Sequence, residues 1–118
     1  MGNVTETRWG SYETLSKGLR YHVKRLIVKP NQRLSKQYHD HRSEIWLVTE
    51  GVAFAEVDDT ERFLYPGESI KIRLGDVHRL SNKEETDLVI IETQYSPDNI
   101  LEESDIVRIE DDYGRVDG

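Results

Sequence analysis

The stretch from residue 37 to residue 44 reads Gln37-Tyr38-His39-Asp40-His41-Arg42-Ser43-Glu44. It groups several candidate metal ligands in a chain of 118 residues that has only four histidines. Alternate residues of an extended strand point to one side, so Gln37, His39 and His41 could share a face, with Glu44 returning after a turn. A carboxylate beside neutral donors suits a hard or borderline divalent cation. The stretch therefore predicts a metal site, although an ordinary exposed polar loop could have the same composition.

The composition favours one domain with one core. The chain has a mass of 13.8 kDa, with 36% hydrophobic and 33% charged residues. We expect a single domain over residues 1–118, divided into an N-terminal arm (1–20), a barrel core (21–95) and an acidic segment (96–118). There is no cysteine, no signal-peptide core and no run near the ~20 apolar residues of a membrane span. A soluble cytoplasmic protein without a membrane partner is expected.

The negative charge is concentrated at the C-terminal end. The formal net charge is −7, and residues 98–118 carry eight acids against Arg108 and Arg115, a net charge of −6. No basic patch occurs elsewhere, so no nucleic-acid partner is expected. An anionic small molecule remains compatible with the sequence, because one pocket needs only a few convergent cations.

Short β-rich runs alternate with turn signals. Strands are expected at residues 21–28, 45–49, 52–57, 61–65, 69–73, 78–81, 88–95 and 105–110, and a turn at 16–18. No stretch keeps a 3.6-residue apolar period over ten or more residues. This pattern predicts an all-β sandwich or small barrel.

A second group of residues lies downstream, with a fixed spacing: Gly67, Arg73, Gly75, His78 and Asn82. It resembles cupin motif two, Gly-x5-Pro-x-Gly-x2-His-x3-Asn, with Arg73 in place of proline. Cupin motif one, Gly-x5-His-x-His-x3,4-Glu-x6-Gly, matches Asn31, Gln37, His39, Glu44 and Gly51, with the first two departing from the usual Gly and His. The resemblance implies a cupin fold, that is, a double-stranded β-helix or jelly-roll barrel.

The spacing of motif one indicates which of the two neighbouring histidines, His39 or His41, is the expected metal ligand. If His39 and His41 were the pair, only two residues would precede Glu44, too few for the motif. The resemblance therefore implies a ligand set of Gln37, His39, Glu44 and His78, with His41 in the loop. We expect a divalent metal ion at this site, zinc first, with Mn, Co, Ni or Fe as alternatives.

The residues present in these motifs resemble those of one cupin group, the mannose-6-phosphate isomerases. These are often fused behind a mannose-1-phosphate guanylyltransferase domain. The shared segments extend along nearly the whole chain: Arg8-Trp9-Gly10-Ser11-Tyr12, Val23-Lys24, Ser35-Lys36-Gln37, Glu44-Ile45-Trp46, Ile91-Glu92-Thr93-Gln94, Asp105-Ile106-Val107-Arg108 and Asp111-Asp112-Tyr113-Gly114-Arg115. The resemblance implies metal-dependent interconversion of mannose 6-phosphate and fructose 6-phosphate. Because cupins commonly pair edge strands, a homodimer is also expected.

Isomerisation requires an acid/base beside the metal. Glu92, Lys24 and His41 are candidates, because each could titrate near neutrality when partly desolvated. Glu92 is two residues from both Ile90 and Gln94 on the expected strand, so the three side chains should point to the same face. That face is expected to line the barrel. Glu92 could equally be a structural ion-pair partner.

The substrate phosphate would require local cations. Arg42 and Arg79 are adjacent to expected ligands in sequence, and Arg8 and Lys24 are further candidates. Gln94 is a further candidate for substrate binding. Two alternatives remain: a non-catalytic sugar-phosphate- or metal-binding cupin, and another metal-cupin enzyme such as a dioxygenase or an archaeal-type glucose-6-phosphate isomerase.

Overall fold

The computed structural model describes residues 3–102 and 104–116, and in these residues the chain forms eleven strands and no helix. The strands are β1 (Val4–Glu6), β2 (Gly10–Gly18), β3 (Tyr21–Val28), β4 (Lys36–Tyr38), β5 (Ser43–Glu50), β6 (Ala53–Val57), β7 (Thr60–Leu64), β8 (Ser69–Ile72), β9 (His78–Ser81), β10 (Leu88–Tyr95) and β11 (Val107–Glu110). Within the described ranges, no helix is long and apolar enough to cross a membrane. The all-β prediction is confirmed.

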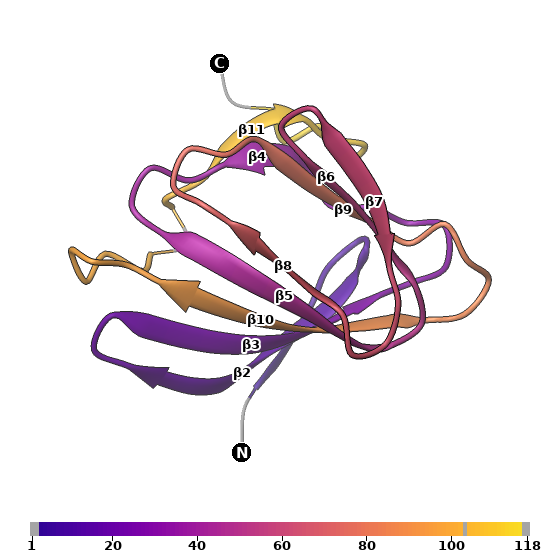
Figure 1. The fold of residues 1–118 in the computed structure, drawn as a ribbon, viewed down its shortest axis with the longest axis horizontal. Coiled ribbons are helices and arrows are strands. Elements are labelled where there is room, and N and C mark those ends of the chain that lie inside the picture. Colours follow the sequence, from indigo (N-terminus) through magenta and orange to yellow (C-terminus); the bar gives the residue numbers. More distant parts are fainter. Residues whose placement is uncertain (1–2, 103, 117–118) are drawn as a thin grey trace.

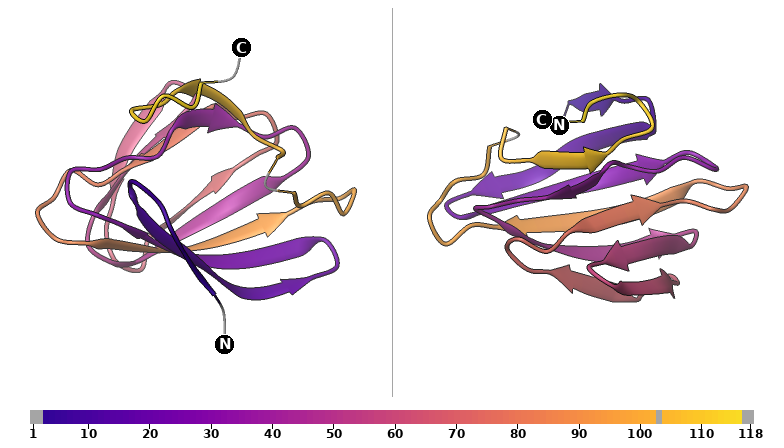
Figure 2. Two further views of the ribbon diagram at one scale, coloured as in Figure 1. Left: turned by 180° about the vertical axis from the view of Figure 1, so that it is seen from behind. Right: turned by 90° about the horizontal axis from the view of Figure 1, so that it is seen from above.

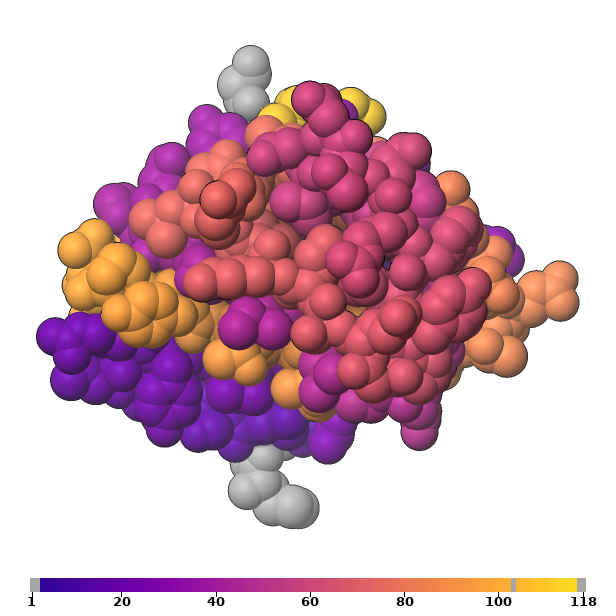
Figure 3. All heavy atoms as spheres, viewed as in Figure 1, coloured from indigo at the N-terminus to yellow at the C-terminus, as the bar shows by residue number. Residues whose placement is uncertain are grey.

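The strands form two antiparallel sheets that face each other (Figure 1). The larger sheet has the order β1-β2-β3-β10-β5-β8, and the smaller has the order β11-β4-β9-β6-β7. Strands that are adjacent in a sheet are often distant in sequence, which is the expected result of winding a chain back and forth between two sheets. Figure 3 shows the outer surface of this barrel, with the N-terminal strands along one side.

The expected N-terminal arm contains two strands of the larger sheet. β2 pairs with β3 along its whole length, so residues 16–18 lie in a strand and the chain reverses at Leu19 and Arg20. This segment has no clean apolar alternation, and its extended conformation follows from pairing with β3. In the view from above in Figure 2, the N-terminal strands and the C-terminal segment lie on the same side of the molecule. Arg8, between β1 and β2, contacts this segment, because its Nη1 donates to the carbonyl of Tyr113 at 3.1 Å.

The interior between the sheets has an apolar end and a polar end. On β10, the inward residues run from Leu88 and Ile90 to Glu92 and Gln94, and all four are buried. The antiparallel register places Lys24 opposite Glu92 and brings the polar halves of β3 and β10 to the same end of the barrel.

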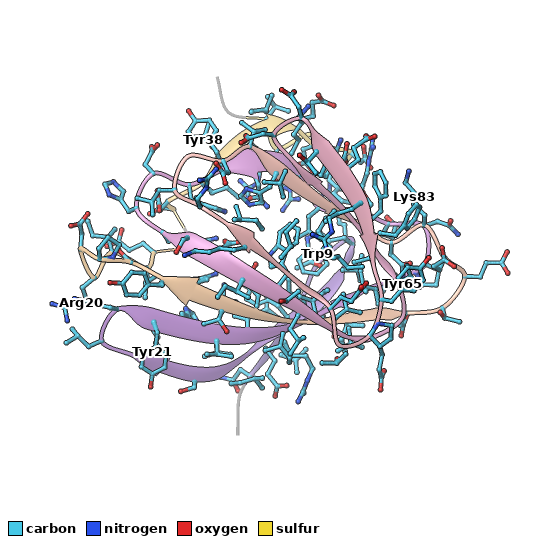
Figure 4. The ribbon with its side chains drawn as sticks, in the orientation of Figure 1. Trp9, Arg20, Tyr21, Tyr38, Tyr65 and Lys83 are labelled. Carbon is cyan, nitrogen blue, oxygen red and sulfur yellow. The ribbon has the colours of Figure 1, made fainter. Side chains whose placement is uncertain are left out.

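The core also includes buried hydrophobic residues of other strands, some of which reach the polar end. Its buried hydrophobic members include two tryptophans and several aliphatic residues: Trp9, Leu26, Val28, Trp46, Val48, Ala53, Ala55, Leu64, Ile72 and Leu80. Figure 4 shows Trp9 between the two sheets, whereas Tyr21, Tyr38 and Tyr65 lie at the periphery. The polar ends of β3, β5 and β10 lie together at the left of Figure 1, and they hold the candidate site.

Candidate metal centre

The four expected metal ligands meet at the polar end of the interior. Gln37 lies on β4, His39 follows that strand, Glu44 is the second residue of β5, and His78 begins β9. All four side chains are buried. Gln37 and His78 are direct partners across β4 and β9, so residues 41 positions apart in the chain are held side by side.

The ligand atoms lie at distances that one metal ion can bridge. Glu44 Oε2 lies 3.2 Å from His39 Nε2, and Glu44 Oε1 lies 3.8 Å from His78 Nε2. The candidate ligand atoms of these three residues all lie within 4.8 Å of one another. Ligands held about 2.1 Å from a tetrahedral ion are about 3.4 Å apart. This buried group could therefore bind a metal ion.

Both histidine rings are oriented by a backbone carbonyl. Nδ1 of His39 bonds to the carbonyl oxygen of Asp105, and Nδ1 of His78 bonds to that of Asp76 at 2.8 Å. A carbonyl only accepts, so each Nδ1 carries a proton, and the Nε2 atom of each ring is directed toward the interior. Outer contacts of this kind are typical of histidines that bind metal.

Two ligand atoms support the fit of a metal ion. Gln37 Oε1 and His78 Nε2 are buried, and neither has a hydrogen-bond partner among the described residues. A buried polar atom without a partner costs roughly 1–3 kcal/mol, and a cation between these two lone-pair donors would remove that cost. The donor set of two imidazoles, one carboxylate and one amide oxygen also suits a borderline divalent ion.

The ionisation states suit metal binding. Burial alone would raise the pKa of Glu44, but the hydrogen bond with His39 and the charge of Arg42 lower this pKa well below its ordinary value. Burial lowers the pKa of His78, and the nearby Glu44 charge offsets this only in part. Glu44 is therefore a carboxylate and His78 a neutral imidazole near neutral pH, which are the forms that bind metal.

A cavity of about 220 Å³ opens beside the ligands. Gln37, Glu44 and Arg42 line one part of its wall, with Lys24 and Glu92 beside them. The remaining lining residues are aromatic, aliphatic or polar: Thr5, Thr7, Trp9, Tyr12, Leu26, Leu34, Ser35, Ile106, Arg108 and Arg115. Two of the expected ligands, Gln37 and Glu44, thus line the same small cavity as the acid/base candidates Lys24 and Glu92.

The Glu92 carboxylate is fixed in the cavity wall by two donors. Trp46 Nε1 donates to Oε1 at 3.1 Å, and Gln94 Nε2 donates to Oε2 at 3.0 Å. Burial and the charge of Glu44 raise the pKa of Glu92 to about 8. The predicted inward orientation of Glu92 and Gln94 is confirmed, and Gln94 lies behind Glu92, outside the cavity lining.

Arg42 lies in the cavity wall but is already engaged with the ligands. Its Nε donates to Glu44 Oε2 at 2.9 Å, and its Nη2 lies 3.3 Å from His39 Nε2. The guanidinium is buried and neutralises the Glu44 carboxylate. Arg42 therefore belongs to the ligand cluster as well as to the cavity.

Three other predicted residues do not reach the cavity. His41 is exposed in the loop after β4. Arg8 is also exposed, and its guanidinium donates to the backbone carbonyl of Tyr113. Arg79 follows His78 on β9, so it points to the opposite face of the sheet, where its Nε donates to the carbonyl of Leu34 at 3.0 Å. The proximity of Arg79 to a ligand in sequence did not translate into proximity at the site.

A family model described as "Mannose-6-phosphate isomerase C-terminal" matches residues 3–111. The chain belongs to this family. Two curated relatives are the mannose-1-phosphate guanylyltransferase ManC of Salmonella typhimurium, 44% identical, and the alginate biosynthesis protein AlgA of Pseudomonas aeruginosa, 45% identical, each over 108 residues. Each alignment covers 92% of this chain and 22% of the relative, so the chain spans about a fifth of the length of these curated relatives.

Solved structures agree with the cupin fold. The capsular polysaccharide assembling protein CapF from Staphylococcus aureus matches with a TM-score of 0.78 at 22% identity, covering 93% of this chain and 32% of that one. A cupin 2 conserved barrel domain protein from Salinispora arenicola matches with a TM-score of 0.71 at 16% identity, covering 82% and 84% of the two chains. These matches bear on the fold alone, and the predicted cupin fold is confirmed.

This member of the mannose-6-phosphate isomerase C-terminal family has further cavity residues that are not among the site residues predicted from its sequence. Arg108 on β11 and Arg115 near the C-terminus bring cations to the cavity wall, and Ser35, Thr5 and Thr7 add polar groups. Arg108 and Arg115 both lie in segments that carry the family resemblance. That resemblance was the available signal, but their distance from the ligands in sequence hid their place beside the cavity.

Proposed function

We propose that the chain is a metal-dependent aldose–ketose isomerase that interconverts mannose 6-phosphate and fructose 6-phosphate. The observation that carries this proposal is the shared cavity, in which Gln37 and Glu44 lie with Glu92 and Lys24. Isomerisation moves a proton between C2 and C1 of a sugar, so it needs an electrophile and an acid/base at one small site. The family description supports this reaction, whereas the guanylyltransferase name belongs to relatives of which the chain spans only part.

The proposed cofactor is a divalent metal ion held by Gln37, His39, Glu44 and His78. Two imidazole nitrogens together with a carboxylate favour zinc, with Mn, Co, Ni or Fe as alternatives. When bound, such an ion supplies Lewis-acid polarisation of the sugar carbonyl and of the developing oxyanion. The four side chains are buried in the barrel, which limits the access of water to the reacting oxygens.

Glu92 is the proposed acid/base. Its two carboxylate oxygens are held by Trp46 and Gln94, so the group is fixed at the cavity wall rather than free to rotate. In this role its carboxylate form takes the proton from C2 and the resulting acid returns it to C1, while a second proton passes from the C2 hydroxyl to the oxygen on C1. Lys24, paired opposite Glu92 and 4.6 Å above the ring of Tyr12, is the second candidate.

The proposed phosphate site is the cationic part of the cavity wall. Arg108 and Arg115 line the cavity together with Lys24, and each offers charged donors to a phosphate. Their presence supports a small phosphosugar as the substrate. A homodimer and a cytoplasmic location remain predictions from the sequence.

A coupled assay with mannose 6-phosphate and added Zn²⁺, Co²⁺ or Mn²⁺ tests the proposal. The unmodified chain should turn over the substrate, and Glu92→Gln should lower kcat by about 10²–10⁴-fold while metal content is kept. Glu61→Gln, on the exposed face of β7, is the matched control and should keep full activity. If the chain bound mannose 6-phosphate but did not convert it with any of the added metals, that result would instead support the alternative of a non-catalytic sugar-phosphate-binding cupin.

A further inference from the structure

The loop that carries His39 is tied to the C-terminal segment by one residue. The two carboxylate oxygens of Asp105 accept the backbone N–H groups of Asp40 at 3.1 Å and of His41 at 3.0 Å. The backbone carbonyl of the same residue accepts Nδ1 of His39. Asp105 thus makes three contacts to three consecutive residues that lie more than 60 positions away in the chain.

The other histidine ligand is held in a different way. Nδ1 of His78 bonds to the carbonyl of Asp76, only two residues earlier in the same turn. That turn is closed by its own contacts, since the Asp76 carboxylate accepts the backbone N–H of Arg73 at 2.9 Å. The carbonyl that orients the His78 ring therefore belongs to its own turn, whereas the carbonyl that orients the His39 ring belongs to a distant segment.

We propose that Asp105 is a positioning residue for the metal centre. Its carboxylate clamps the N–H groups of residues 40 and 41, which fixes its own carbonyl against His39 and directs Nε2 of that ring toward Glu44. The inference rests on the proposed metal site and not on the isomerase reaction. It also gives the acidic C-terminal segment a role at the site, in place of the solvated surface that its composition suggests.

The clamp has a direct consequence for metal affinity. A ring held by its Nδ1–H keeps one tautomer and one orientation, so little conformational freedom is lost when Nε2 binds a cation. Without the clamp, the loop would no longer hold the carbonyl of residue 105 against the ring. Loss of such an outer contact typically weakens metal binding by about 10–100-fold.

Asp105→Asn tests the clamp with little change in shape. An asparagine can accept from only one of the two backbone N–H groups, because its amide nitrogen would face the other. We expect the zinc affinity, measured by competition with a chelator, to fall about 10–100-fold. Asp98→Asn is the matched control, since it removes the same charge from an exposed position in the same acidic segment and should keep the affinity of the unmodified chain.

The tautomers of the histidine rings give a second readout. The chain has only four histidines, so ring nitrogen NMR signals can be assigned with single variants. In Asp105→Asn, His39 should lose its defined Nδ1–H tautomer while His78 keeps its own. This comparison needs neither metal nor substrate, so failure of the clamp is distinguishable from failure of the proposed isomerase.

Three outcomes would overturn the inference. One is an Asp105→Asn variant with unchanged zinc affinity and an unchanged His39 tautomer. Another is the joint loss of both defined tautomers together with a lower Tm, which would make Asp105 a general folding residue. The third is an unmodified chain that binds no divalent metal, a result that would also remove the proposed metal site. The tautomer measurement would still report whether Asp105 orients the His39 ring.

Discussion

The two ends of the barrel interior differ in composition although the same strands build both. At the apolar end, Leu88 and Ile90 of β10 pack against Leu26 and Val28 of β3, and all four are buried. At the polar end, the next inward positions of the same strands are Glu92 and Lys24, which are also buried. Burying a charged or polar side chain costs free energy unless it is paired, so the polar end contributes less to stability than its buried area suggests.

This difference shows where stability and function are separated in the molecule. Native domains are only marginally stable, and ionisable groups at inward positions of a barrel are tolerated where they are paired and useful. Here the polar end holds the whole candidate ligand set and the apolar end holds none of it. Substitutions at the two ends should therefore have different consequences.

The largest effect should come from removing a ligand at the polar end. His39→Ala and His78→Ala should each lose stoichiometric divalent metal, because each removes a buried Nε2 that faces Glu44. His41→Ala should keep its metal, since His41 is exposed outside the cluster. Metal analysis of the purified variants measures this, and equal metal content in His39→Ala, His78→Ala and the unmodified chain would contradict the assigned site.

A cavity at the apolar end should mainly reduce stability. Ile90→Ala removes buried methyl groups and should lower the free energy of unfolding by about 2–5 kcal/mol. Glu92→Gln, two residues along the same strand, keeps the side-chain volume, and its new amide nitrogen can donate to Gln94 Oε1 once the Gln94 amide rotates. This variant should therefore change the free energy of unfolding by less than about 1 kcal/mol. Urea unfolding of both variants makes the comparison, and an equal loss for Glu92→Gln would show that the polar end is as important to the fold as the apolar core.

Part of the difference between the polar and the apolar end of the barrel could be predicted from the sequence. The alternation of β10 correctly predicted that Glu92 and Gln94 face inward, because a two-residue period is set by strand geometry alone. The same geometry explains why Arg79 lies away from the cavity, since neighbours on a strand point to opposite faces. The motif spacing brought His39, Glu44 and His78 into one cluster, as the structure has them.

The contribution of the chain ends could not be read from local patterns. β2 forms because β3 offers it a paired edge, and Arg115 reaches the cavity because the C-terminal segment folds back across the barrel. Asp105 contacts the ligand loop through backbone groups, which carry no residue-specific signal in the sequence. These are long-range contacts, and only the folded chain shows them.

A moderate effect is expected at the cationic part of the cavity wall. Arg115→Gln should raise KM for mannose 6-phosphate about tenfold to a hundredfold, equivalent to roughly 1.5–3 kcal/mol, with metal content unchanged. Arg79→Gln is the comparison, because Arg79 is bonded to Leu34 on the other face of its sheet and should keep KM. Steady-state kinetics separate the two variants. A raised KM in Arg79→Gln alone would favour the position predicted from sequence over the cavity position.

The smallest effect should be a pH-dependent loss of stability from the pair that holds Arg115. Burial would raise the pKa of Asp111, but its hydrogen bonds and ion pair with Arg115, 2.7 Å away, lower this pKa to about 2. A carboxyl whose folded pKa lies below its ordinary value stabilises the fold above that ordinary value, and the contribution is lost as the pH falls toward the folded pKa. Because Arg115 is exposed to solvent, the pair contributes only about 0.2–1 kcal/mol. Asp111→Asn should therefore have a lower free energy of unfolding than the unmodified chain at pH 7, and the gap should narrow between pH 4 and pH 2.

Urea titrations across this range measure the gap, with Asp98→Asn as the charge-matched control. A gap that stayed constant with pH would mean that Asp111 acts through packing or hydrogen bonding that does not depend on its charge.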